Sequence, residues 1–226
     1  MTPFVIAIIL SAAMLHAVWN AIVKTAVDRT TTLGLVALGH VIPGAVMVAV
    51  LPLPELQSLW YVALSTVVHF GYFYMLGRAY QHGDLSVVYP IARGIVPALV
   101  GLWAMIFVGE VLPLQAWLGI GLIGLGIQLS SWKALRSGVG RTALWYALGT
   151  GVCISIYSLV DGVGVRLSGN TLSYWAWGAF LHLFVTIFVF WRKRDALPTV
   201  PMRVWALGIA GGLVSMCAYG LVLFAK

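Results

Sequence analysis

The sequence predicts an all-α integral membrane protein, a polytopic helical bundle of about eight transmembrane helices. Of its 226 residues, 62% are hydrophobic and only 8% are charged. Its mean hydropathy of +1.00 is far above that of a water-soluble domain. Apolar runs of about 20 residues, the length that crosses about 30 Å of hydrocarbon, follow one another along the chain. Most of the surface therefore faces lipid, which leaves no room for a soluble catalytic domain.

Proline, glycine and charged residues mark the limits of the apolar runs. Pro52 and Pro54 separate the second run from the third, and Gly109 and Pro113 separate the fourth from the fifth. Basic loops follow the fifth and seventh runs. The predicted spans are residues 3–24, 31–51, 58–80, 84–108, 113–131, 143–164, 172–191 and 203–225.

The net charge of +7 comes from Lys and Arg residues that cluster between the predicted spans. When the loops are assigned alternately to the two sides of a membrane, most of these residues lie on one side. The positive-inside rule makes that side cytoplasmic and places the amino terminus outside. The charge is therefore interpreted as a topology signal, and the sequence predicts a lipid bilayer and no nucleic acid as partner.

The fourth span carries the strongest local signal, the run from Gly83 to Gly94. Pro90 within it, and Pro97 shortly after it, have no N–H to donate, so we expect a kink that exposes carbonyl groups. Arg93 lies well inside this span, where an arginine costs at least about 2.5–3.5 kcal/mol and usually faces a cavity or a partner. An explanation for Arg93 is therefore needed.

Tyr89 lies on the same face of the helix as Arg93. A guanidinium fork, a phenol and freed carbonyls on one face suit an anionic or zwitterionic small molecule, so we predict that both residues bind substrate. The alternative is that Arg93 pairs with Asp161 and that the prolines only shape the bundle.

Three other spans place polar and aromatic residues in helical register. We predict that six of them join the substrate site: His16, Trp19 and Asn20 in the first span, His69 and Tyr72 in the third, and Tyr157 in the sixth. Asp161 is predicted to be the carboxylate that couples transport to protons. The alternative is that these side chains only bond one helix to another. His40 and His182 have fewer polar neighbours in register and are less favoured.

No cofactor and no metal site are expected. Gly119, Gly121 and Gly124 spell G-x-G-x-x-G, but no strand precedes them and they lie inside an apolar helix, so a dinucleotide site is rejected. We expect them, and Gly208 and Gly212 in the last span, to form smooth faces for close helix packing. Motifs of metalloproteases and serine hydrolases are also missing, so the sequence does not predict an enzyme.

Weak internal similarity indicates a repeat, because Trp19 and Asn20 in the first span are similar in kind and placement to Tyr157 and Asp161 in the sixth. Many transporters consist of two inverted copies, and an odd number of helices per copy produces the inversion. We therefore assign residues 1–132 to a first repeat of five helices and 133–226 to a partial second repeat of three.

Three motifs together resemble the drug/metabolite transporter superfamily, specifically the EamA-type permeases of bacteria. They are His16-Ala17-Val18-Trp19-Asn20 with Lys24, the run Gly83-Asp84-Leu85-Ser86 to Tyr89-Pro90-Ile91-Ala92-Arg93-Gly94, and Gly109-Glu110. The resemblance implies ten helices in two inverted five-helix repeats, a central cavity, and export or exchange of metabolites such as amino acids across the inner membrane. Because eight spans are predicted, the second repeat is expected to lack its last two helices.

Two functions follow as expectations. The first is a secondary transporter that moves a small metabolite, an amino acid or a related anionic or zwitterionic compound, by alternating access. The second is a truncated, inactive or accessory membrane protein that needs a partner chain. A homo-oligomer or a complementing chain is the protein partner that this second function predicts.

Overall fold

The computed structural model describes residues 3–136 and 140–225, and all secondary structure in these ranges is helical. The middle of the predicted basic loop, residues 137–139, lies outside them. The helices are α1 (Pro3–Thr25), α2 (Arg29–Val50), α3 (Leu56–His82), α4 (Leu85–Gly94), α5 (Val96–Trp103), the π-helix η1 (Ala104–Val108), α6 (Leu114–Arg136), α7 (Arg141–Leu167), α8 (Thr171–Phe180), α9 (Leu183–Lys193), the 3-10 helix η2 (Leu197–Thr199) and α10 (Met202–Phe224).

Seven helical stretches of the described residues are long and apolar enough to cross a bilayer. The apolar part of α6, Leu114–Ile127, is shorter than a full span, although the helix continues to Arg136. The predicted all-α, multi-pass membrane bundle is therefore confirmed.

Two predicted spans are not single helices. The span predicted at 84–108 consists of α4, α5 and η1, with a break at Ile95, close to the prolines that predicted a kink. The span predicted at 172–191 consists of α8 and α9, with a break at Leu181 and His182. No break was expected there, because the segment contains no proline.

The chain divides into two compact units. Unit 1 comprises residues 1–66 and 161–226, and unit 2 comprises residues 67–160. Helices α3 and α7 each contribute residues to both units.

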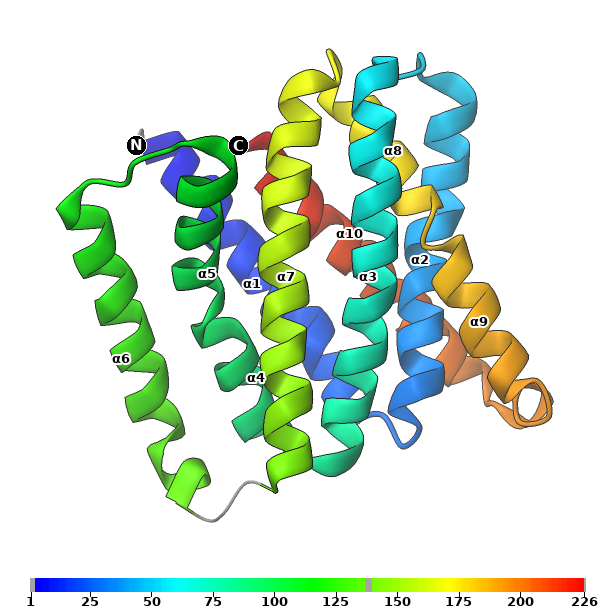
Figure 1. Ribbon diagram of the computed structural model, residues 1–226. Coiled ribbons are helices and arrows are strands. Elements are labelled where there is room, and N and C mark those ends of the chain that lie inside the picture. Colours follow the sequence, from blue (N-terminus) through cyan, green and yellow to red (C-terminus); the bar gives the residue numbers. More distant parts are fainter. Residues whose placement is uncertain (1–2, 137–139, 226) are drawn as a thin grey trace. The chain divides into compact units, whose positions relative to one another are not determined.

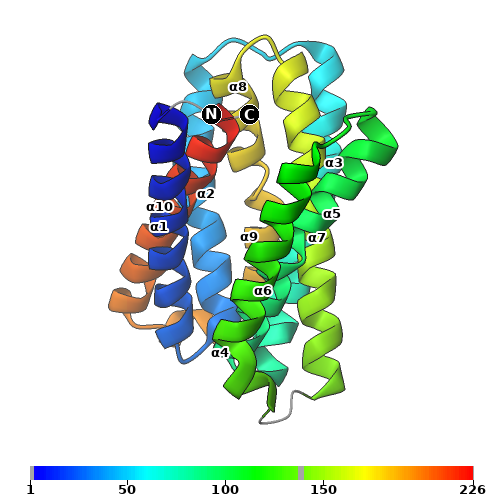
Figure 2. The same cartoon turned by 90° about the vertical axis from the view of Figure 1, so that its left-hand side faces the viewer.

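In unit 1, α2 contacts α1, α8, α9 and α10. The contact with α10 is close because both helices present glycine: a Cβ added at Gly39 would lie 2.7 Å from the Cα of Gly212. Gly208 of α10 likewise accommodates Leu35 of α2, whose Cβ would lie 2.5 Å from an added Cβ. The expected packing role of Gly208 and Gly212 is therefore confirmed. Helices α1 and α10 are antiparallel neighbours, so the start of α1 and the end of α10 lie at the same end of this unit (Figures 1 and 2).

In unit 2, α7 packs against both α3 and α4. A Cβ added at Gly149 of α7 would lie 3.2 Å from the sulfur of Met75 in α3. One added at Gly151 would lie 2.6 Å from the carbonyl oxygen of Ala92 in α4. Helix α6 contacts α4 from another side, and Figure 1 shows α4 and α5 as consecutive short helices.

The glycines of α6 do not form the expected close contact. No described atom of unit 2 lies within 4 Å of a Cβ added at Gly119, Gly121 or Gly124. The packing prediction for these three residues is wrong within this unit, because α6 meets α4 through residues such as Ile127 instead.

Candidate substrate site

The break between α4 and α5 places Arg93 in the last turn of α4. Asp84 caps the start of α4, accepting hydrogen bonds of 2.8 Å from both the N–H and the hydroxyl of Ser86. The carbonyl of Arg93 would normally accept from residue 97, but Pro97 has no N–H. The N–H of Ile95 donates to this carbonyl instead. The prolines therefore fix both the end of the helix and the place of Arg93.

Four tyrosines surround the guanidinium of Arg93. Its Cζ atom lies 5.6 Å from the centre of the Tyr89 ring, within the range of a cation–π interaction. The other electrostatic neighbours of the guanidinium are Tyr157, Tyr72 and Tyr80. Among the residues of unit 2 with described side chains, no carboxylate forms an ion pair with Arg93. The positive charge is therefore held by phenols and aromatic faces.

His69 joins this group through its ring. It stacks on Tyr157 with ring centres 4.0 Å apart and an interplanar angle of 22°. Tyr72 meets Tyr157 edge-on at 5.8 Å and His69 edge-on at 6.4 Å. Tyr72 and Tyr157 are buried, whereas His69 and Arg93 are half-buried. We call the five residues Arg93, Tyr89, Tyr72, Tyr157 and His69 the arginine–tyrosine cluster.

The structure thus brings together five of the eight predicted substrate-binding residues. The other three lie in unit 1, on α1, and form a local network. The indole N–H of Trp19 donates to Nδ1 of His16 over 2.9 Å, and the amide of Asn20 donates to the carbonyl of His16 over 2.7 Å. Trp19 and Asn20 are buried. Their role as substrate ligands stays a prediction.

Asp161, the predicted coupling residue, also lies in unit 1 and is almost fully buried. Its carboxylate accepts a hydrogen bond of 2.8 Å from the hydroxyl of Tyr174 and a short one from the hydroxyl of Tyr219. Gly164 makes room for the ring of Tyr174, because an added Cβ would lie 2.6 Å from its Cε2 atom. The sequence did not single out Tyr174. The rule that could have identified it is that a buried tyrosine needs a hydrogen-bond partner for its hydroxyl group.

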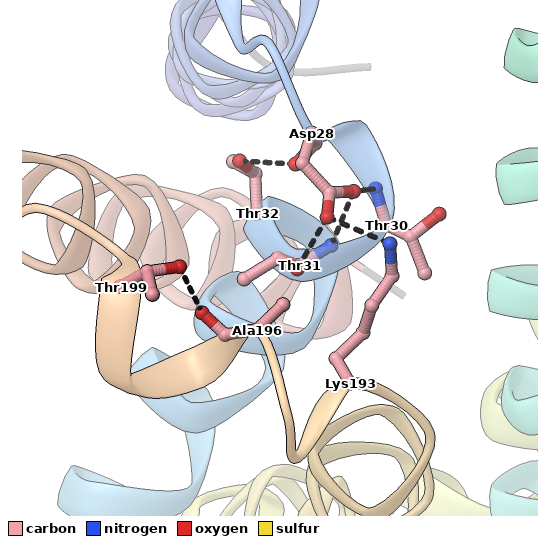
Figure 3. Close-up of polar contacts among 7 residues, drawn as sticks. All are labelled: Asp28, Thr30, Thr31, Thr32, Lys193, Ala196 and Thr199. Atoms are coloured by element: carbon pink, nitrogen blue, oxygen red, sulfur yellow. Dashed lines mark hydrogen bonds and ion pairs between the residues drawn. The ribbon is translucent and has the colours of Figure 1, made fainter.

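A second polar centre that the sequence analysis missed is built around Asp28, the N-cap of α2 (Figure 3). Its Oδ1 atom accepts from the N–H groups of Thr30 at 3.0 Å and Thr31 at 3.2 Å. Its Oδ2 atom accepts from the Thr31 hydroxyl at 2.8 Å and from Nζ of Lys193 at 2.7 Å. One carboxylate thus caps α2 and holds the end of α9.

The pKa of Asp28 reflects two opposing effects. Burial raises the pKa, but the hydrogen bonds from Lys193 and Thr31, together with the charge of Lys193, outweigh burial and hold the pKa below its ordinary value. Two sequence features could have predicted this contact. Lys193 lies in the last turn of one helix and Asp28 lies before the first turn of another, where the helix dipoles favour these charges.

A family model described as the EamA-like transporter family matches residues 3–132, more than half of the chain. The chain belongs to the EamA-like transporter family. The resemblance found in the sequence is therefore confirmed, and the protein is a multi-pass membrane protein of a transporter family. The comparison with curated proteins finds no match.

The family match covers part of the site only. Arg93, Tyr89, Tyr72 and His69 lie within it, whereas Tyr157 and Asp161 lie beyond it. Its range corresponds to the region assigned to the first repeat, but the division into two inverted repeats stays a prediction.

Proposed function

We propose that this EamA-like protein is a secondary transporter of a small anionic or zwitterionic metabolite, such as an amino acid, in the inner membrane of a bacterium. Transport proceeds by alternating access, and Arg93 binds the anionic group of the substrate. The observation that carries the proposal is the environment of Arg93: an arginine beside a helix break, surrounded by tyrosines, with no described carboxylate of its unit to neutralise it.

The chemistry of the cluster supports this substrate class. A guanidinium presents a planar fork of donors that matches a carboxylate, and such charge-assisted pairs are strong where water is scarce. The tyrosine hydroxyls add donors and acceptors, and the rings of Tyr72, Tyr157 and His69 supply an apolar wall. Broken helices line the substrate sites of many transporters, because free backbone groups there are available to a ligand.

Asp161 is the proposed coupling residue. The carboxylate of Asp161 is almost fully buried and accepts from two phenols, and uptake of a proton would remove its charge from this buried place. Intramembrane carboxylates commonly relay protons in transporters. The coupling ion is therefore a proton, and Asp161 is the residue that binds it.

The test compares Arg93→Lys and Arg93→Ala with the parent protein in proteoliposomes, using uptake of a radiolabelled amino-acid mixture. Loss of a charge-assisted bidentate contact predicts a fall in uptake of about 10- to 100-fold for Arg93→Ala, and a smaller fall for Arg93→Lys, which keeps the charge but not the fork. Size-exclusion profiles show whether each variant is folded.

The matched control is Arg78→Lys. Arg78 also lies over a tyrosine, with Cζ 5.4 Å from the ring of Tyr146, but it is close to the end of α3 and outside the cluster. We expect uptake by this variant to stay within about twofold of the parent, since surface polar contacts contribute little. Equal uptake by Arg93→Ala and the parent would contradict the role of Arg93.

A further inference from the structure

Two histidines that were not favoured as site residues face each other inside unit 1. His40 lies on α2, and His182 lies at the break between α8 and α9. Their rings are stacked with centres 4.6 Å apart and an interplanar angle of 24°. The two residues are only 5% and 9% exposed, so the two imidazoles lie together in a buried position.

The break at His182 explains why an imidazole is there. In a continuous helix, the N–H of His182 would donate to the carbonyl of Gly178. At the break it donates to the carbonyl of Ala179 instead, over 3.2 Å. The Nδ1 atom of the His182 ring lies 2.8 Å from the Gly178 oxygen. Because a carbonyl only accepts, Nδ1 carries the hydrogen, and Nε2 is the nitrogen that takes up or releases a proton.

The α2 side of the pair is equally constrained. Pro43 lies inside α2 and has no N–H for the carbonyl of Gly39, the residue next to His40. A Cβ added at Gly44 would lie 2.6 Å from the backbone nitrogen of Phe180, the last residue of α8. Backbone packing therefore holds α2 against the break, about one turn from His40.

Other titratable groups of unit 1 lie further along the helices that pack on the pair. On α2, Asp28 and Arg29 precede His40 by about three turns, and on α9, Arg192 and Lys193 follow His182 by a similar number. Tyr174 of α8 is about two turns away and donates to Asp161. The other helices that contact α2 carry His16 and Lys24 on α1, and Arg203, Cys217 and Tyr219 on α10.

We propose that His40 and His182 form a shared binding site for one proton in unit 1. This inference goes beyond the proposed substrate site and does not depend on it. A single imidazolium is stabilised by the face of the neutral imidazole stacked on it. A second proton is excluded, since two positive rings at this separation repel each other strongly in a buried site. The neutral pair takes up one proton, and the charged pair releases it.

The experiment is a pH titration of the purified, full-length protein in lipid nanodiscs, without substrate, followed by ring nitrogen-15 NMR of labelled histidine. The five histidines give five sets of signals, which single substitutions assign. We expect the His40 and His182 signals to change together between about pH 5 and 9 and to account for one proton in total.

Two variants separate a shared proton from independent titration. His182→Asn retains an N–H donor near the Gly178 carbonyl but removes Nε2, and His40→Phe retains the stacked ring without nitrogen. In each variant, the remaining imidazole is expected to titrate at a midpoint displaced by about one pH unit or more. If one variant does not fold, the other makes the same measurement.

His82 provides the control. Its Nδ1 atom also lies 2.8 Å from the carbonyl four residues earlier, that of Arg78, but the side chain is exposed and its ring lies beside Tyr146 instead of another imidazole. Its ring signals should be the same in all variants at any given pH. The inference is overturned if neither buried histidine takes up a proton in this range, if both take one each, or if the midpoint of one is unchanged when the other is replaced.

Discussion

The two broken spans, α4–α5 and α8–α9, solve the same problem by different means. Each break leaves a carbonyl without its usual donor, and a basic side chain lies at or next to the break. In α4–α5, Pro97 removes the donor and the backbone N–H of Ile95 replaces it. In α8–α9 there is no proline, and the ring of His182 bonds the freed carbonyl of Gly178.

The first break has a cause within its own segment, whereas the second depends on packing against another helix. A proline removes the N–H of its own residue wherever it is placed, so the carbonyl four residues earlier loses its donor for a purely local reason. The α8–α9 break depends on α2, whose Gly44 allows the backbone at Phe180 to approach closely. We therefore expect the α8–α9 break to require its contact with α2, and the α4–α5 break to persist when its own residues change but the prolines remain.

The largest effect is expected for Gly44→Ala. The added methyl group would lie 2.6 Å from the nitrogen of Phe180 and 3.0 Å from the carbonyl carbon of Ala179. Backbone atoms cannot turn away, so the helices must separate, with a loss of about 3 kcal/mol in the free energy of unfolding. Unfolding in mixed micelles, followed by circular dichroism, measures this change.

Gly94→Ala is the matched variant at the other break. The nearest atom to its added Cβ is Cγ2 of Ile127, at 3.1 Å, which is a side-chain atom that can shift. We expect a change within about 1 kcal/mol, because alanine also favours the helix relative to glycine. A loss at Gly94 as large as that at Gly44 would remove the distinction between the two breaks.

A smaller effect is expected for His182→Phe, which preserves the ring but leaves the carbonyl of Gly178 without its donor. The bond to this carbonyl is part-buried, and an unsatisfied buried polar group costs about 1–3 kcal/mol, so we expect a loss of about 1 kcal/mol or more. His182→Asn, with its side-chain N–H, should recover most of that loss.

The same unfolding measurement on His82→Phe is the control, since water can bond the carbonyl of Arg78, whose bond to His82 is exposed. An equal loss of stability in His82→Phe would show that burial is not the cause.

The smallest effect concerns the ion pair that anchors the end of α9. Both partners are more than a third exposed, so Lys193→Gln should cost less than about 1 kcal/mol at neutral pH. The pKa of Asp28 is lower in the folded state. Its contribution to stability is therefore complete above the unfolded pKa of about 3.9 and is lost as the pH falls through the folded value.

The difference in stability between the parent and Lys193→Gln should accordingly begin to shrink below about pH 4 and disappear once the pH is below the folded pKa of Asp28. Unfolding measured at a series of pH values tests this. Asp28→Asn, which retains an N-cap acceptor, should show no such pH dependence at this position. A difference that persists at low pH would mean that Lys193 stabilises α9 by another contact.

Residues with a local physical signature could be predicted from the sequence. Hydrophobic runs predict the membrane helices, and Pro90 and Pro97 predict the interrupted fourth span. The charge of Arg93 within a predicted span indicates the position of the cluster. Helical register placed Tyr89 beside Arg93. These features depend on single residues or on spacing along one helix.

Features that arise only from packing could not be predicted. The stacking of His40 on His182 joins residues that are far apart in the sequence. It also depends on the break at His182, which no proline in that segment predicts. The bond from Tyr174 to Asp161 and the bond from Lys193 to Asp28 likewise connect separate helices. The packing of the α6 glycines was wrongly predicted because a small residue permits close contact but does not supply the neighbour.

The length of α3 and α7 has a consequence for the membrane itself. Each has 27 residues and so rises about 40 Å, whereas the hydrocarbon core is about 30 Å thick. Helices α1 and α10, with 23 residues each, are closer to that thickness. Hydrophobic mismatch in a thin bilayer is therefore borne first by α3 and α7, which tilt or extend their ends among the headgroups. Bilayer thickness is thus a physical variable to which these two helices respond before the others.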